Sequence, residues 1–300
     1  MAGQVLILCA TRLEMAAFFD RTRTGYTVKF AKGLTVFSSR NHSWDLVISG
    51  PGVFNAARAL TACLERFQPA FILHTGIAGM FDSTGLNPGD AAVALTETYI
   101  HTGVDKGRTG GTRRTGGTNW TADKDPKTRQ SRPGHPAAAH PKGHTGKADS
   151  HQGPAPLPGD SGFPIPLDPL PFDLVAGEAM TRQGVYTLDP DLAGSCKDLL
   201  VRSLGCSVIQ GPFITVSSIT GSYEKAAALS QVFSPVMESM EGAAAAHVAA
   251  LYQVPMVEIR AAANRVGERD KNRWDMKGAV RTVADICEAI VCRSDSKELP

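Results

Sequence analysis

Short apolar runs alternate with helical patterns along most of the chain. Strands are predicted where β-branched and aromatic residues cluster, and helices where apolar residues recur with a period near 3.6. The expected strands are Val5–Ala10, Tyr26–Ala31, Leu34–Ser38, Trp44–Ser49, Phe71–Thr75, Asp90–Tyr99, Ser207–Val216 and Val257–Ala263. The expected helices are Leu13–Phe19, with Thr11 as its N-cap, Asn55–Phe67, Asp189–Leu204, Gly242–Tyr252 and Lys277–Val291. This alternation favours an α/β fold, and one three-layer domain over residues 1–300 accounts for it.

One segment, from about Val104 to Gly162, breaks this pattern. It is rich in Gly, Thr, Pro, Lys and Arg, is nearly free of aliphatic side chains, and shows no periodicity. Such a segment cannot bury enough apolar surface to offset the entropy of ordering it, so we expect a disordered insertion in a surface loop. The irregular spacing of its four histidines, His135, His140, His144 and His151, favours a solvated loop over a metal site.

The composition favours a small-molecule partner. The 300 residues carry 31 basic and 29 acidic side chains, and this net charge of +2 is too balanced for a nucleic-acid or membrane surface. The six cysteines show no CxxC pair and no regular spacing, so we expect reduced, mostly buried thiols. The first ten residues lack a basic region, and no stretch approaches the ~20 apolar residues of a membrane span. We therefore expect a cytoplasmic protein.

Three candidate groups lie near the ends of predicted strands, where α/β proteins gather their ligands. Glu14 opens the first helix, Met240 and Glu241 precede the helix Gly242–Tyr252, and Asn264 follows the last strand. A carboxylate such as Glu241 can accept hydrogen bonds from both hydroxyls of a ribose. Each group also has a structural explanation, because acidic residues stabilise helix starts and amides are common in loops.

Two glycine-bearing segments follow predicted strands, where a backbone without side chains can approach a ligand closely. They are Ser49-Gly50-Pro51-Gly52 and the small-residue loop Gly76-Ile77-Ala78-Gly79. Neither completes GxGxxG or the P-loop pattern, so dinucleotide and P-loop nucleotide binding are discounted. The GxSxG and HExxH patterns are missing as well, which leaves serine-hydrolase and zinc-protease chemistry without local support.

Taken in order, five short motifs resemble the nucleosidases that cleave methylthioadenosine and adenosylhomocysteine. They are Glu14, the turn 49–52, the segment 75–79, Met240-Glu241 and the segment 260–264. The resemblance covers nearly all of the chain outside the insertion. It implies a three-layer, purine nucleoside phosphorylase-like α/β fold whose central mixed sheet is partly barrel-like and flanked by helices.

The resemblance also implies roles for individual residues. Glu14 would activate the attacking water, and Met240 and Glu241 would pack against and hydrogen-bond the ribose. The substrate would further contact Ser49, Ile77, Ala78 and Gly79. The resemblance implies a homodimer or larger homo-oligomer, and the reaction needs no metal or organic cofactor.

Asn264 distinguishes this chain from the adenine-releasing nucleosidases, which carry an aspartate as leaving-group acid at that position. An amide cannot deliver a proton, but its NH2 group can hydrogen-bond the 6-oxo group or N7 of hypoxanthine or guanine. The segment 264–270, followed by Trp274-Asp275, resembles futalosine hydrolases, which release hypoxanthine from futalosine in menaquinone biosynthesis. We therefore predict hydrolysis of the N-glycosidic bond of futalosine to hypoxanthine and dehypoxanthinyl futalosine. Ile219 and Thr220 fall near the position of the base-stacking aromatic of the nucleosidases, and Phe213 is another candidate for stacking.

Three alternatives remain open. A phosphorylase of the same fold would need an anion site, which Arg12 and the backbone of residues 50–52 could supply, although Glu14 would repel phosphate. A methylthioadenosine or adenosylhomocysteine nucleosidase is disfavoured by Asn264. A non-catalytic nucleoside-binding module is disfavoured by the presence of both Glu14 and Glu241.

Overall fold

The computed structural model describes residues 4–22, 26–31, 34–40, 43–104 and 167–295, which form one mixed ten-stranded sheet with helices. The strands are β1 (Val5–Cys9), β2 (Tyr26–Ala31), β3 (Leu34–Ser39), β4 (Trp44–Ile48), β5 (Phe71–Met80), β6 (Ala91–Tyr99), β7 (Val185–Thr187), β8 (Val208–Thr215), β9 (Met237–Ser239) and β10 (Met256–Arg265). The α-helices are α1 (Ala16–Arg21), α2 (Val53–Leu64), α3 (Pro190–Ser203), α4 (Tyr223–Phe233), α5 (Gly242–Tyr252) and α6 (Met276–Asp295).

The centre of the sheet closes on itself. Strands β10, β6, β8, β9 and β5 are neighbours in that order, and β10 also pairs with β5, so that these strands form a ring. Strands β1, β4, β3 and β2 extend from β5 as an open arm. The register of β10 against β5 shifts between Ala262 and Asn264, so that Asn264 pairs with Gly79. This mixed, partly barrel-like α/β arrangement confirms the fold predicted from the sequence.

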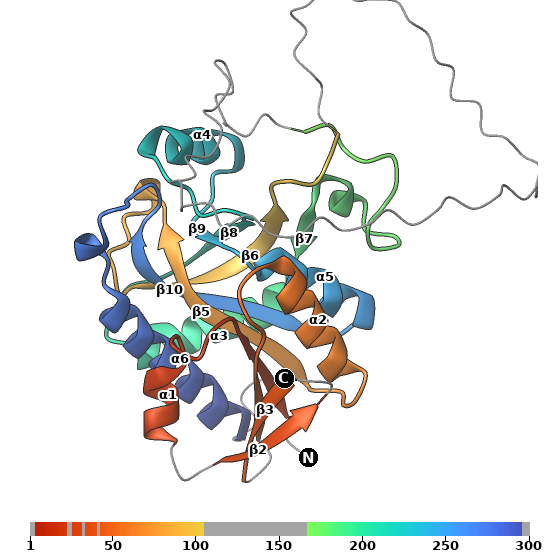
Figure 1. Cartoon of the computed structure of the whole chain (residues 1–300), viewed down its shortest axis with the longest axis vertical. Coiled ribbons are helices and arrows are strands. Elements are labelled where there is room, and N and C mark those ends of the chain that lie inside the picture. Colours follow the sequence, from red (N-terminus) through yellow and green to blue (C-terminus); the bar gives the residue numbers. More distant parts are fainter. Residues whose placement is uncertain (1–3, 23–25, 32–33, 41–42, 105–166, 296–300) are drawn as a thin grey trace, which may run out of the picture. The chain divides into compact units, whose positions relative to one another are not determined.

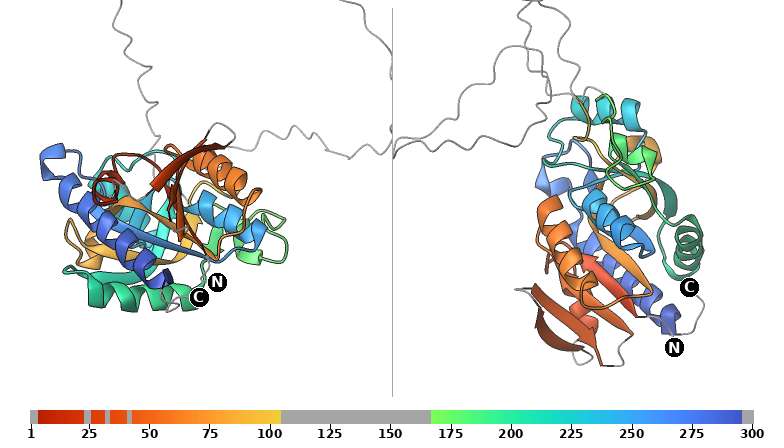
Figure 2. Two further views of the ribbon diagram at one scale, coloured as in Figure 1. Left: turned by 90° about the horizontal axis from the view of Figure 1, so that it is seen from below. Right: turned by 90° about the vertical axis from the view of Figure 1, so that its right-hand side faces the viewer.

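Helices cover both faces of the sheet (Figure 1 and Figure 2). One core cluster joins the sheet to α1, α3 and α6 and includes Phe18, Leu192 and Ile286. A second cluster lies under α2 and α5 and includes Leu60 and Ala246. Burial on both faces explains why central strands such as β1 are apolar throughout rather than alternating.

Most predicted elements are present, but two predictions about turns are wrong. Residues 76–79 are not a loop: they continue β5, because β10 and β9 pair with its two edges at Gly79. Helix α1 begins at Ala16 rather than next to Thr11, because residues 11–14 form a turn in which the Glu14 N–H donates to the Thr11 hydroxyl. The sequence pattern also does not predict β7, β9 or α4.

Residues on both sides of the gap at 105–166 belong to one compact unit. Val104 and Asp168 exchange backbone hydrogen bonds of 2.8 and 2.9 Å across the ends of this gap. The predicted disordered insertion, with its four histidines, lies outside the described residues except for Val104. All six cysteines are free, and four of them are buried. No helix within the described ranges is long and apolar enough to cross a bilayer.

Candidate active site

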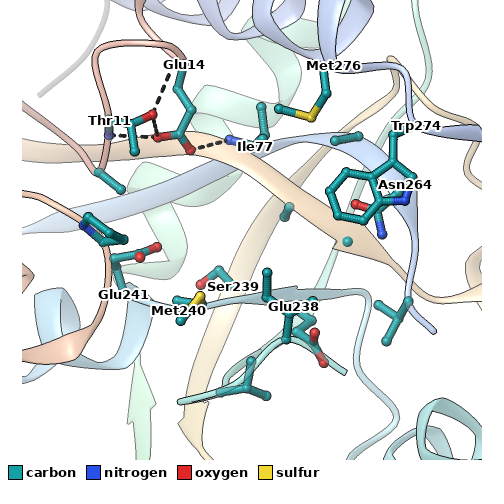
Figure 3. A pocket seen from close by; sticks show the side chains of 18 of the residues that line it. Thr11, Glu14, Ile77, Glu238, Ser239, Met240, Glu241, Asn264, Trp274 and Met276 are labelled. Atoms are coloured by element: carbon teal, nitrogen blue, oxygen red, sulfur yellow. Dashed lines mark hydrogen bonds between the residues drawn. The ribbon is translucent and has the colours of Figure 1, made fainter. Parts of the chain in front are cut away.

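A cavity of about 310 Å³ opens where the carboxyl ends of β1, β5 and β10 meet the junction of β9 and α5. This volume lies within the range of small-molecule sites. Three lining side chains are carboxylates, namely Glu14, Glu238 and Glu241, and none of the lining residues is Lys, Arg or His. Figure 3 shows Glu14 and Glu241 toward one side of the cavity, with Asn264 and Trp274 toward the other.

Glu14 is held by donors from two strand ends. Its Oε2 accepts hydrogen bonds from the N–H and the hydroxyl of Thr11 over 2.8 and 2.7 Å, and its Oε1 accepts from the N–H of Ile77 over 3.0 Å (Figure 3). The Cys9 thiol also donates to Oε2 over 3.5 Å. Burial and the nearby Glu14 charge raise the pKa of Cys9 well above its ordinary value, so this thiol keeps its proton.

Arg260 is a fully buried cation that adjoins both carboxylates of this side of the site. Its Nε donates to Glu258 Oε1 over 2.8 Å, and its Nη2 donates to His74 Nε2 over 2.8 Å and lies 3.9 Å from Glu241 Oε2. Burial lowers the pKa of Arg260, but the charges of Glu258, Glu241 and Glu14 outweigh burial and raise it, so the guanidinium stays ionised.

The remaining guanidinium nitrogen of Arg260, Nη1, is buried and has no hydrogen-bond partner within the described part of the chain. Gly76 shows how close it comes to Glu14: a Cβ on this glycine would lie 2.7 Å from Arg260 Nη1 and 2.6 Å from Glu14 Oε1. The two side chains therefore lie against the backbone of Gly76, and only a residue without a side chain leaves them this room.

Glu241 lies on the same side of the cavity as Glu14, immediately before α5 (Figure 3). Its Oε1 accepts a 2.7 Å hydrogen bond from the N–H of Gly52, which ties the glycine turn after β4 to this carboxylate. Met240 lies beside it and also lines the cavity. The pair therefore presents one acidic and one apolar surface to a ligand.

The other side of the cavity combines an amide, an indole and the third carboxylate. Asn264 Nδ2 donates to the Arg265 carbonyl over 2.8 Å, and Trp274 Nε1 donates to the Glu268 carbonyl over 3.2 Å. These bonds hold the amide and the indole next to each other (Figure 3). Both polar groups keep further hydrogen-bonding or stacking surface for a heterocycle.

Most of the predicted site residues line the cavity: Glu14, Ile77, Ala78, Gly79, Ile219, Met240, Glu241 and Asn264. Ser49 and Thr220 do not line it, although Thr220 hydrogen-bonds the lining residue Glu238. Phe213 is fully buried in the core, so its position does not support a stacking role. Trp274 is the aromatic side chain among the lining residues.

The sequence alone predicts no role for Arg260, Glu238 or Trp274. Arg260 is a charged residue inside the otherwise apolar end of a strand. This pattern predicts buried polar partners, because burying an unpaired charge is costly. Glu238 is likewise a charged residue in a buried strand, the short strand β9. No group of three or more His, Cys, Asp or Glu side chains within the described ranges could hold a metal ion.

Comparison with known proteins places this chain in a family. The family model described as "Phosphorylase superfamily" matches residues 4–294. The chain belongs to the phosphorylase superfamily. Another protein with the superfamily fold is the futalosine hydrolase of Helicobacter pylori strain 26695, whose native structure superposes with a TM-score of 0.67. That match covers 98% of this chain and 99% of the other at 16% identity, so it shows a shared fold.

Two curated relatives of this phosphorylase-superfamily chain are named as nucleoside hydrolases. A futalosine hydrolase of Thermus thermophilus is 31% identical over 141 residues, which are 47% of this chain and 60% of the relative. A 5'-methylthioadenosine/S-adenosylhomocysteine nucleosidase of Maridesulfovibrio salexigens is 24% identical over 224 residues, which are 74% and 68% of the two chains. The chain therefore spans less than two thirds of the first relative's length.

Proposed function

We propose that this protein is a nucleoside hydrolase that cleaves the N-glycosidic bond of futalosine and releases hypoxanthine, in the cytoplasm and within menaquinone biosynthesis. The observation that carries the hydrolase assignment is the pair of buried carboxylates, Glu14 and Glu241, that line one side of the cavity. In the proposed reaction the attacking water binds in the cavity beside Glu14, which takes its proton.

The bond changes balance without a cofactor. The C1′–N9 bond breaks and its electron pair moves to the purine, while the water oxygen bonds to C1′. The proton that Glu14 takes is matched by one that the purine takes up from solvent. Glu241 and Glu14 stabilise the positive charge that develops on the ribose, and Glu241 also accepts hydrogen bonds from the ribose hydroxyls.

The charge of the cavity supports water rather than phosphate as the nucleophile. Three carboxylates line it and none of its lining side chains is cationic. Arg12, the candidate anion ligand, instead lies over the rings of Phe19 and Phe37, with its Cζ 5.2 and 5.7 Å from their centroids. A phosphate anion would meet net repulsion here.

The base end supports a 6-oxopurine. Asn264 supplies an amide rather than an acid, which suits hydrogen bonding to O6 or N7 and not proton delivery to adenine. The similarity to the Thermus thermophilus futalosine hydrolase points in the same direction. The similarity to the Maridesulfovibrio salexigens nucleosidase makes methylthioadenosine the second substrate to test.

The deciding experiment incubates the purified protein with futalosine, inosine and methylthioadenosine, each with and without phosphate, and identifies the released base and sugar by chromatography. Phosphate-independent release of hypoxanthine from futalosine alone is expected. Adenine release from methylthioadenosine would overturn the substrate assignment. Strict dependence on phosphate would make the enzyme a phosphorylase.

We also propose that the protein is a homodimer or larger homo-oligomer, as its sequence resemblance implies. Phe54 on α2 is 88% exposed and borders a largely apolar hollow with Val53, Ala57 and Ala243. An exposed aromatic next to such a hollow is typical of a subunit contact. Light scattering on the wild type and on Phe54→Glu tests this: a monomeric wild type contradicts the proposal.

A further inference from the structure

The third carboxylate of the cavity, Glu238, has no part in the hydrolytic chemistry proposed above. It is 5% exposed and lines the cavity on the same side as Asn264 and away from Glu14 (Figure 3). No ion pair to Glu238 forms within the described ranges. A buried carboxylate without a cation is costly unless donors satisfy it, so this residue calls for an explanation.

The sheet puts Glu238 and Asn264 on either side of one glycine. Gly79 of β5 pairs with Glu238 of β9 on one edge and with Asn264 of β10 on the other. Paired residues of neighbouring strands project to the same face, and two strand spacings separate the outer Cα atoms by roughly 10 Å. A Cβ on Gly79 would lie 3.0 Å from Val266 Cγ2 and 3.7 Å from Asn264 Nδ2, so both side chains lie close to the glycine. Glu238 and Asn264 therefore line the cavity from the strands on opposite edges of β5.

The hydrogen bonds of Glu238 leave it with spare acceptor capacity. Its Oε1 accepts from the N–H of Thr220 over 2.9 Å, and its Oε2 accepts from the Thr220 hydroxyl. Each carboxylate oxygen offers two acceptor positions, so each retains one. Burial raises the pKa of Glu238, and the two hydrogen bonds from Thr220 oppose this shift, as expected for a carboxyl group that is shielded from water.

We propose that Glu238 reads the base by accepting a hydrogen bond from the N1–H of a 6-oxopurine, while Asn264 binds the adjacent O6 and N7 edge. This inference rests on the proposed function. The lactam form of a 6-oxopurine has a donor at N1 and an acceptor at O6, whereas a 6-aminopurine has a lone pair at N1. A carboxylate at N1 attracts the first and repels the second. Glu238 is therefore a specificity-determining residue.

The competing explanation is that Glu238 only fastens the loop of Ile219 and Thr220 to β9. The two explanations differ in how they depend on the base. If Glu238 only holds the loop in place, its loss changes the affinity for every base by the same factor, because the loop lines the cavity whatever base is bound. If Glu238 hydrogen-bonds N1, its loss changes the affinities for 6-oxopurines and 6-aminopurines in opposite directions.

The test compares wild type, Glu238→Gln and Thr220→Val in alkaline buffer. Calorimetry measures the binding of hypoxanthine, adenine and 1-methylhypoxanthine, and turnover is measured on futalosine and its 6-amino analogue. Gln keeps the shape of Glu but offers an N–H to an N1 lone pair. We expect Glu238→Gln to weaken hypoxanthine binding ~10- to 100-fold and to strengthen adenine binding, so that the ratio of the two reverses. Thr220→Val is the matched control, and it should shift all bases by the same factor.

If Glu238→Gln loses the same factor of affinity for hypoxanthine and for adenine, the inference is overturned and Glu238 only holds the loop in place. A second readout needs no variant: wild type should bind 1-methylhypoxanthine ~10- to 100-fold more weakly than hypoxanthine, because the methyl group removes the N1 donor. Equal binding of the two would also overturn the inference. Failure of the proposed function is seen separately, as a wild type that cleaves no 6-oxopurine nucleoside.

Discussion

Glu97 and Glu258 hold their carboxyl groups in one fully buried space beneath α5. A Cβ on Gly242 would overlap Glu97 Oε1 and lie 2.5 Å from Glu258 Oε2, and neither oxygen has a hydrogen-bond partner among the described residues. Burial and then the charge of Glu258 raise the pKa of Glu97 well above its ordinary value. Burial also raises the pKa of Glu258, but His74 and Arg260 outweigh it and lower this pKa to about 2. Glu97 therefore carries the proton and Glu258 the charge.

The proton on Glu97 makes the stability of the fold depend on pH. A raised pKa in the folded state means that Glu97 contributes stability in acid, and that this contribution is lost as the pH rises through its folded pKa. Glu97→Gln replaces the carboxyl O–H with an amide N–H, so it keeps a donor toward Glu258 but does not titrate. Its melting temperature should therefore exceed that of wild type in alkaline buffer. Thermal unfolding across pH checks this, and parallel curves for the two proteins would contradict a buried proton on Glu97.

Glu14→Gln should abolish turnover and leave binding intact. The amide cannot take a proton from water, so kcat should fall by at least ~100-fold while hypoxanthine affinity changes little. Glu224→Gln, an exposed acid at the start of α4, is the matched control and should keep wild-type activity. Unchanged turnover in Glu14→Gln would remove Glu14 from the mechanism.

Asn264→Asp should change the base that is released. The aspartate can carry a proton to N7, so cleavage of 6-amino nucleosides should rise, while cleavage of futalosine should fall because the amide donor to O6 is lost. Chromatography of the bases released from futalosine and methylthioadenosine measures both changes. A variant that loses futalosine cleavage without gaining adenine release would indicate that Asn264 acts only through packing.

Arg260→Met should destabilise the protein strongly, because it leaves Glu258, Glu241 and Glu14 close together without their shared cation. Breaking a buried ion pair in this way costs about 3–5 kcal/mol. Arg21→Met is the control, since Arg21 pairs with Asp285 and Glu288 at the surface. Exposed pairs of that kind contribute under ~1 kcal/mol. Urea unfolding of both variants should separate them clearly, and equal losses would contradict the buried network.

Residues 105–166 should be dispensable for the fold. Val104 and Asp168 already exchange backbone hydrogen bonds, so a short Gly-Ser link can join the two ends without moving either. The shortened chain should melt within a few degrees of the full chain and cleave the same substrate. Loss of folding would show that the insertion contributes contacts to the domain, and loss of activity alone would assign it a part in the site.

The strand order around the site was harder to predict than its chemistry. Val5–Cys9 and the helix Gly242–Tyr252 follow from local pattern, because burial on both faces and helical spacing are visible in the residues themselves. The segment 76–79 has no such pattern. Its strand conformation comes from pairing with β9 and β10, which lie more than 150 residues later in the chain.

Part of the candidate site could be predicted from the sequence and part could not. Glu14, Glu241 and Asn264 were brought together by resemblance, since residues this far apart in sequence carry no local sign of proximity. Arg260 and Glu238 could not be predicted as site residues, because the folded sheet brings their partners to them. These partners are Glu258 and His74 for Arg260, and Thr220 for Glu238. Phe213 was a reasonable stacking candidate by residue type, but its side chain faces the core.

The register shift in β10 separates two tasks along one strand. Arg260 lies before the shift, fully buried among its carboxylates, where any change is felt by the whole core. Asn264 lies after it, followed by the surface residue Arg265. Under the proposed roles, substitutions beyond the shift would alter which base is accepted without disturbing Glu14 and Glu241. One substrate could then be exchanged for another through the last residues of this strand, while the proposed hydrolytic residues stay unchanged.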